Sequence, residues 1–145
     1  MIAGHFYFLK QDYLQQFPNM TDIHRPYFCA FTDGNDIYWL VPISSKVEKF
    51  ERIYNDKVKR YGKCDTIDFC RVLGRKKAVL IQNMCPVTQD YVLNEYLDPH
   101  EKPVQLCDKV RKRIIHKAKK VLSLQRQGVD LIFGDVFAIK KKLMP

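Results

Sequence analysis

The sequence predicts an α+β fold with an antiparallel sheet, and three observations lead to this class. Segments rich in β-branched and aromatic residues alternate with segments of helical periodicity. Short turn sequences join neighbouring strand segments, as they do in local hairpins. At 145 residues and 46% hydrophobic, the chain is long enough for one core of ordinary size. We therefore expect a single domain that spans residues 1–145.

The first forty residues predict a strand, a short helix and a hairpin. Residues 4–9 are a strand segment, and residues 12–17 are expected to form a helix that Asp12 caps and Pro18 ends. Residues 27–31 and 37–41 are strand segments on either side of a turn sequence around Gly34. This hairpin places Arg25 and Tyr27, at the start of one strand, beside the end of the other strand.

An amphipathic helix is predicted after this hairpin. The helical spacing of its apolar residues begins after residues 42–45, and the helix ends near Gly62. The pair Ser44 and Ser45 is thereby expected at a helix N-terminus, where free N–H groups and the helix dipole favour a phosphate or an oxyanion. In the alternative interpretation, Ser45 and Glu48 form a capping box that only completes the helix end. The apolar face of this helix consists of Val47, Phe50, Tyr54, Val58 and Tyr61.

The second half of the chain predicts a further hairpin and two helices. Residues 67–73 and 78–84 are strand segments with a basic tip between them, and residues 91–97 fit either a strand or a helical turn. Residues 98–103 form a loop. The longest helical pattern covers residues 104–127 and ends at Gly128, and a last helix over residues 136–143 is expected after Asp135 as its cap.

The charge of the chain is strongly uneven. The formal net charge is +9, of which residues 1–56 contribute −2 and residues 57–145 contribute +11. This distribution favours a polyanion partner, most plausibly nucleic acid, although a basic surface also keeps a protein in solution. The long helix presents a cationic stripe that suits a phosphate backbone or is simply a solvated face. The predicted RNA contacts are Lys57, Lys59, Arg60, Arg75, Lys76, Lys109, Lys112, Arg113, Lys117 and Lys120.

Several classes of protein are disfavoured by the motifs that the sequence lacks. Its five cysteines form no CxxC pair, which argues against a disulfide framework and a zinc ribbon, so they are expected to be structural. Its four histidines show no metal-ligand spacing, and no motif for a nucleotide or another cofactor is present. No run of about 18 apolar residues and no signal peptide is visible, so a cytoplasmic protein without a metal, cofactor or membrane partner is expected.

The remaining chemistry suits RNA cleavage. Serine, tyrosine, arginine and lysine near a helix N-terminus can hold a phosphate and stabilise added negative charge. In metal-free cleavage the 2′-hydroxyl of the substrate is the nucleophile, and the products are a 2′,3′-cyclic phosphate and a 5′-hydroxyl. The protein has to align the reacting atoms and stabilise the phosphorane.

An ordered set of short motifs over nearly the whole chain resembles the toxins of type III toxin–antitoxin systems, the ToxN and AbiQ kind of endoribonuclease. The long basic helix over residues 104–127 belongs to this resemblance. The motifs are Phe6-Tyr7 with Tyr13, then Arg25-Pro26-Tyr27, the strand at Tyr38 that leads to Pro42-Ile43-Ser44-Ser45-Lys46, and Met84-Cys85-Pro86-Val87.

This resemblance implies a twisted antiparallel sheet with an SH3-like barrel core, related to the MazF, Kid and CcdB toxins, with helices around it. It also implies metal-independent cleavage of mRNA at adenine-containing sites. The partner would be an antitoxin RNA made of pseudoknot repeats, which binds the toxin in a closed toxin–RNA assembly. The toxin itself would cut this RNA from its precursor. The outcome would be growth arrest or abortive infection.

The resemblance also implies site residues, namely Tyr13, Tyr27, Ser44, Ser45 and a lysine that follows them. The family has Pro and then Lys after the hydroxyl pair, whereas here Lys46 follows directly, so the lysine is either Lys46 or Lys49. Arg25 joins this set through the predicted hairpin. Two other functions remain open, a non-catalytic RNA-binding module and a toxin of the same fold that acts on a protein target.

Overall fold

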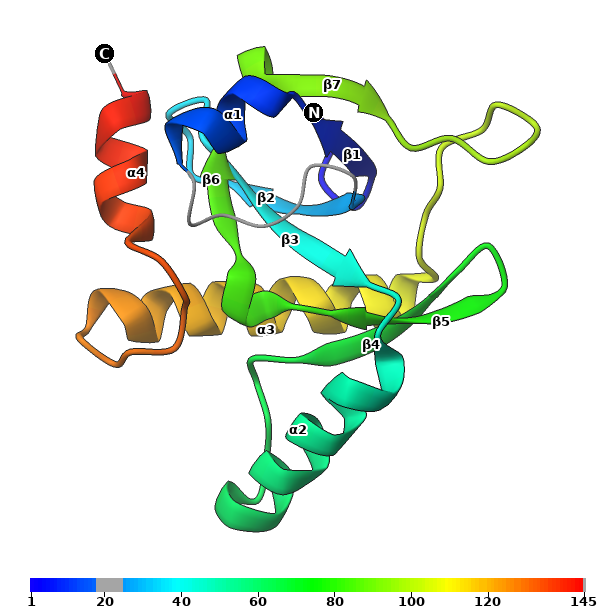
Figure 1. The fold of residues 1–145 in the computed structure, drawn as a ribbon, viewed down its shortest axis with the longest axis vertical. Helices are drawn as coiled ribbons and strands as arrows, with labels where there is room; N and C mark the ends of the chain where they lie inside the picture. The colour runs from blue at the N-terminus through cyan, green and yellow to red at the C-terminus, as the bar shows by residue number, and fades with distance from the viewer. Residues whose placement is uncertain (18–24, 145) are drawn as a thin grey trace.

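The structure, a computed structural model, describes residues 1–17 and 25–144. Strands and helices are interspersed along this part of the chain, as predicted (Figure 1). The strands are β1 (Phe6–Leu9), β2 (Tyr27–Thr32), β3 (Tyr38–Ser44), β4 (Asp68–Val72), β5 (Arg75–Val79), β6 (Cys85–Val87) and β7 (Val92–Glu95). The helices are α1 (Gln11–Gln16), α2 (Val47–Tyr61), α3 (Asp108–Arg126) and α4 (Val136–Leu143), with 3-10 turns η1 (Ile81–Asn83) and η2 (Gln89–Tyr91).

The described strands form one sheet whose pairings are all antiparallel. The strand order is β4-β5-β3-β2-β1-β7, and β6 pairs with β3 off this path. The predicted α+β class with an antiparallel sheet is therefore confirmed. The sheet ends at β4 and at β7, so it is open and does not close into a full barrel.

Strand β3 is longer than predicted and continues through Pro42 to Ser44. One edge of β3 pairs with β2, whereas its other edge pairs with β6 at Tyr38–Leu40 and with β5 at Ile43 and Ser44. Pro42 lies where this second edge changes partner, and its carbonyl accepts a hydrogen bond from Leu80 N–H at 2.9 Å. A proline is tolerated there because no strand partner needs its missing N–H group. The predicted strand end at residue 41 is therefore wrong, whereas the helix begins after residues 42–45 as expected.

The β4–β5 hairpin turns at Leu73 and Gly74, which both have positive φ angles (51° and 79°). Two such residues match the twist of the flanking strands, so Arg75 belongs to β5 and not to the tip that the sequence suggests. The predicted strand over residues 78–84 is also wrong. Strand β5 ends at Val79, and η1 separates it from β6.

Helix boundaries follow the predictions at α2 and α4 but not at α1 and α3. Gly62 ends α2 in the left-handed conformation, and Asp135 caps α4 by accepting from Ala138 N–H at 3.3 Å. The cap of α1 is Lys10 rather than Asp12. Helix α3 begins at Asp108, since the preceding segment is extended and buries Val104 in the core.

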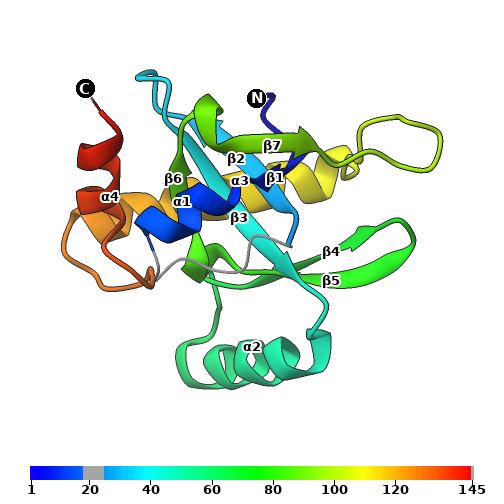
Figure 2. The same ribbon diagram turned by 45° about the horizontal axis from the view of Figure 1, so that its top comes forward.

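The apolar core lies between the sheet and the described helices. Helix α3 buries Ile114, Ala118 and Val121 against the sheet, and α2 packs through Phe50 on the β4–β5 hairpin. Figures 1 and 2 show α2 and α3 on opposite sides of this hairpin. Cys107, directly before α3, is exposed, while the other four cysteines are buried thiols. None of the described helices is long and apolar enough to cross a membrane.

A buried carboxylate anchors α3 to the sheet. Asp68, 5% exposed, accepts from Arg113 Nε at 2.9 Å and from its NH2 group at 3.0 Å, and Lys117 Nζ lies 3.3 Å away. Arg113 also donates to the Phe69 carbonyl on the outer edge of β4, at 3.2 Å. Lys120 pairs with the partly exposed Asp65 at 2.9 Å. These three cations of the predicted RNA-binding stripe are therefore engaged with carboxylates of the fold, and Arg113 and Lys117 hold a buried one.

We expect Asp68→Asn to lower the free energy of unfolding by about 2 kcal/mol at neutral pH, since it leaves half-buried cations without their counter-charge. Burial raises the pKa of the Asp68 carboxyl, but hydrogen bonds from Arg113 and Phe69 N–H and the charge of Lys117 outweigh burial and lower this pKa below its ordinary value. Because the folded-state pKa is depressed, this stabilisation is complete above the unfolded-state value of about 3.9 and disappears as the pH falls through the folded-state pKa.

Chemical denaturation of wild type and variant between pH 7 and pH 2 measures this difference. Asp56→Asn is the matched control, because Asp56 pairs with Arg60 on the exposed surface of α2 and its loss should have almost no effect. Equal stability of wild type and Asp68→Asn at pH 7 would show that the buried network does not stabilise the fold.

Candidate functional site

The hydroxyl pair lies at the junction of β3 and α2, but its two members have different surroundings. Ser44 is the last residue of β3, is buried, and accepts from Lys46 N–H at 3.2 Å. Ser45 is exposed in the turn that follows. The cap of α2 is Lys46, and no side chain caps this helix. The proposed capping box of Ser45 and Glu48 is therefore wrong, because the strand extends to Ser44 and shifts the helix start to Val47.

The Ser45 hydroxyl instead contacts a lysine from another strand. Lys77 Nζ on β5 donates to Ser45 Oγ at 2.8 Å. The contact follows from the antiparallel register of β3 and β5, in which Ser44 stands opposite Ala78, so Ser45 comes opposite Lys77, the residue before Ala78. Sequence reasoning missed Lys77 because the pairing of β5 with β3 is not local. The run of three basic residues at 75–77 was its one visible signal.

Ser45 lines two pockets. The first, of about 230 Å³, contains Ser45 and Lys77 from the β3 and β5 side of the strand order and two aromatic side chains from the β1 and β7 side. Its lining residues are Phe8, Pro26, Ile43, Ser44, Ser45, Val72, Lys77 and Tyr96. The second, of about 490 Å³, lies over the start of α2 and is lined by Ser45, Lys46, Val47, Glu48, Lys49 and Arg52. A helix N-terminus and three cations make this second pocket suitable for phosphate groups.

The fold brings some of the predicted neighbours close to Ser45 and buries others elsewhere. The hairpin places the start of β2 beside the end of β3 as expected, since Ile43 N–H donates to the Pro26 carbonyl at 3.2 Å. Arg25 precedes Pro26 and is half-buried, and Lys46 and Lys49 line the basic pocket. Tyr27 is fully buried and lines neither pocket.

Tyr13 lies in a separate part of the core. Its side chain is 0% exposed, its hydroxyl donates to the Pro86 carbonyl at 2.6 Å, and its ring packs against Phe17 and Tyr91. Burial raises the pKa of Tyr13 above its ordinary value, so the hydroxyl stays protonated as a donor. Among the described residues, this geometry gives Tyr13 a structural contact and does not bring it to the pocket at Ser45.

The predicted RNA contacts also differ in their surroundings. Lys57 donates to Thr66 Oγ1 at 2.9 Å, Arg60 pairs with Asp56, and Lys76 pairs with Glu51. As described above, Arg113, Lys117 and Lys120 pair with buried or half-buried carboxylates. Of the predicted contacts, Lys59, Arg75, Lys109 and Lys112 are exposed and have no ion pair to any described residue. These four are the predicted contacts that remain free for an external phosphate.

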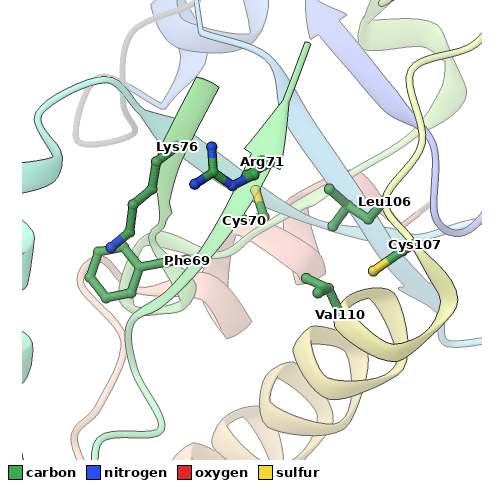
Figure 3. A pocket seen from close by; sticks show the side chains of 7 residues that line it. All are labelled: Phe69, Cys70, Arg71, Lys76, Leu106, Cys107 and Val110. Carbon is green, nitrogen blue, oxygen red and sulfur yellow. The ribbon is translucent and has the colours of Figure 1, made fainter. Parts of the chain in front are cut away.

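A further pocket, of about 570 Å³, lies between the β4–β5 hairpin and the start of α3 (Figure 3). Its lining is mainly apolar, with Leu106 and Val110 on one side, and Arg71 and Lys76 reach it from the hairpin. It contains none of the predicted catalytic residues. Its chemistry is therefore less suited to phosphate transfer than that of the pockets at Ser45.

No protein-family model matches the sequence, and no curated protein is significantly similar to it. A solved structure does share the fold. The fold resembles that of AbiQ. AbiQ is a lactococcal anti-phage endoribonuclease of a type III toxin–antitoxin system, and the two structures align with a TM-score of 0.60 at 15% sequence identity. The alignment covers 81% of this chain and 79% of AbiQ, so the likeness extends over most of both molecules.

We expect Tyr13→Phe to lower the free energy of unfolding by about 1 kcal/mol, because it removes a buried hydrogen bond and leaves the Pro86 carbonyl without its donor. For a chain of this size the loss corresponds to a fall in melting temperature of roughly 2–4 °C. Calorimetry measures it, with Tyr61→Phe on the exposed surface of α2 as the control. A Tyr13→Phe protein that melts like the wild type but no longer acts on RNA would show that this hydroxyl serves the substrate.

Proposed function

We propose that this protein is a metal-independent endoribonuclease toxin that cuts mRNA at a phosphate held by Ser45 and Lys77. The hydrogen bond from Lys77 Nζ to Ser45 Oγ, between the two pockets, is the observation on which the proposal rests. Two further observations support it. The fold resembles that of an endoribonuclease toxin, and the charge of the chain suits a polyanionic substrate.

The contact between Lys77 and Ser45 prepares both groups for a phosphate. Because the ammonium donates to Ser45 Oγ, the hydroxyl hydrogen of Ser45 is free to point toward a phosphate oxygen, and the ammonium keeps two further hydrogens for the same purpose. Donors placed in advance around the position of developing charge cost little reorganisation during the reaction. Lys46, Lys49 and Arg52 would bind neighbouring phosphates of the strand over the start of α2.

The proposed reaction is a transesterification. The 2′ oxygen of the substrate attacks the phosphorus atom, and the bond to the 5′ oxygen of the next nucleotide breaks. One proton leaves the 2′-hydroxyl and one proton joins the departing oxygen, so a 2′,3′-cyclic phosphate and a 5′-hydroxyl result. Ser45 and Lys77 stabilise the added negative charge of the phosphorane, which is the largest requirement of this step.

We also propose that an antitoxin RNA of pseudoknot repeats inhibits the toxin, and that the toxin cuts this RNA from its precursor. Release of the toxin would then arrest growth or abort a phage infection in the cytoplasm. The exposed cations Lys109 and Lys112 at the start of α3 are suited to contact the backbone of this RNA, because lysines on a helix meet phosphates more readily than base edges.

Cleavage of a long mRNA in the presence of EDTA tests the proposed activity, with 5′-hydroxyl ends mapped by sequencing. We expect Ser45→Ala to lower kcat by about 100-fold or more, and Lys77→Gln to have an effect of similar size, since each removes a donor to the phosphorane. Ser123→Ala and Lys141→Gln are matched controls on exposed positions of α3 and α4. Wild-type cleavage by Ser45→Ala would refute the proposed site, and binding of RNA without any new ends would favour a non-catalytic RNA-binding module.

The antitoxin contact is tested by replacing Lys109 and Lys112 together with Gln. Each lost phosphate contact should lower the slope of log affinity against log salt concentration by about 0.7 to 0.9 units, while the melting temperature stays unchanged. Arg113 is left in place because it holds Asp68. Lys141→Gln with Lys142→Gln removes the same charge from α4, so an equal change of slope in this control would show that net charge alone is responsible.

A further inference from the structure

Two aromatic rings form the wall of the small pocket opposite Ser45 and Lys77. Phe8 extends from β1, and Tyr96 follows directly after β7. Their ring centroids lie 5.2 Å apart with an interplanar angle of 57°. Both side chains are half-buried and line the pocket, so part of each ring faces the cavity.

The fold holds these rings firmly. Tyr96 N–H donates to the Phe6 carbonyl at 2.8 Å, and the Tyr96 carbonyl accepts from Val104 N–H at 3.1 Å. Behind the wall, the fully buried ring of Phe6 meets Tyr96 edge-on, with centroids 6.5 Å apart. A wall fixed in this way loses little conformational freedom when a flat ligand stacks on it.

The pocket therefore combines aromatic rings with the hydroxyl of Ser45 and the ammonium of Lys77. The rings suit a flat base, and the two donors suit the phosphate attached to it. Its volume of about 230 Å³ is below the roughly 300–1,000 Å³ of sites for drug-sized ligands, which favours a single base. A rim of the core would also explain two half-buried aromatic residues, but not their position across a cavity from Ser45 and Lys77.

We propose that Phe8 and Tyr96 form a stacking site for one nucleobase that flanks the scissile phosphate. The inference rests on the proposed function, in which Ser45 and Lys77 hold that phosphate. Stacking fixes the nucleotide so that its phosphate reaches the two donors. Because a paired base in a duplex cannot enter the pocket, the site selects single-stranded RNA.

The test measures binding of a single-stranded RNA oligonucleotide that carries a 2′-deoxy sugar at the cleaved position and is therefore not cut. Abasic sites are introduced one position at a time, and the wild type is compared with Tyr96→Leu. In the wild type, one abasic position next to the cleaved bond should weaken binding about 5-fold or more. In Tyr96→Leu the same abasic position should have no effect, since its stacking partner has already been removed.

Three comparisons separate stacking from charge and from folding. Tyr96→Phe keeps the ring, so the abasic position should weaken binding to this variant as it does in the wild type. Tyr96→Leu should leave the salt dependence of binding unchanged, whereas Lys77→Gln should reduce it. Tyr61→Leu replaces an exposed ring on α2 and should bind as the wild type does. Phe8→Leu is a second variant of the wall and should reproduce the effect of Tyr96→Leu.

The outcomes for the two proposals are distinct. If the wild type cuts mRNA but each abasic position weakens binding equally in the wild type and in Tyr96→Leu, the stacking site is refuted and the proposed activity stands. If the wild type neither cuts nor binds single-stranded RNA, the proposed function fails and the stacking site fails with it. Equal binding of the oligonucleotide and of its duplex with a complementary strand would also overturn the proposed selection.

Discussion

Strand β3 pairs on both of its edges, and on one edge it changes partner half-way. Leu40 pairs with β6, Ile43 pairs with β5, and Pro42 occupies the position between them, where no ladder bond is needed. Because β5 and β6 are joined by the short turn η1, the register of one strand constrains that of the other. This double pairing brings Lys77 to Ser45, and the candidate site depends on it.

Ion pairs with α3, instead of backbone pairing with another strand, hold β4 on the other side of the β4–β5 hairpin. Asp68 on β4 accepts from Arg113 and contacts Lys117, and Arg113 also covers a carbonyl on the open edge of β4. An uncovered edge strand can pair with other chains, and this contact occupies one carbonyl of that edge. The cations of α3 therefore have two roles. Some secure the helix to the sheet, and Lys109 and Lys112 at its start remain exposed to solvent.

The candidate site at Ser45 combines groups from distant parts of the chain. The hydroxyl comes from the turn after β3, the ammonium from β5, the aromatic wall from β1 and the residue after β7, and the cationic groups from the first turns of α2. Few of these residue types are unusual in the strand, turn or helix to which they belong. Ser45 thereby lines two pockets, one that also contains the aromatic rings and Lys77 and one that contains the cations of α2, and the proposed binding of a base and of phosphates rests on this arrangement.

Local patterns in the sequence determined the α+β class, the hairpin of β2 and β3, the end of α2 at Gly62 and the cap of α4 at Asp135, because propensity, capping and turn chemistry act between near neighbours. They also drew attention to Ser44 and Ser45, whose motif resembles that of the type III toxins. Only the tertiary structure decided that β3 passes through Pro42, that Tyr13 is buried against Pro86, and that Lys77 meets Ser45. Each of these depends on contacts between residues more than thirty positions apart, which no local period encodes.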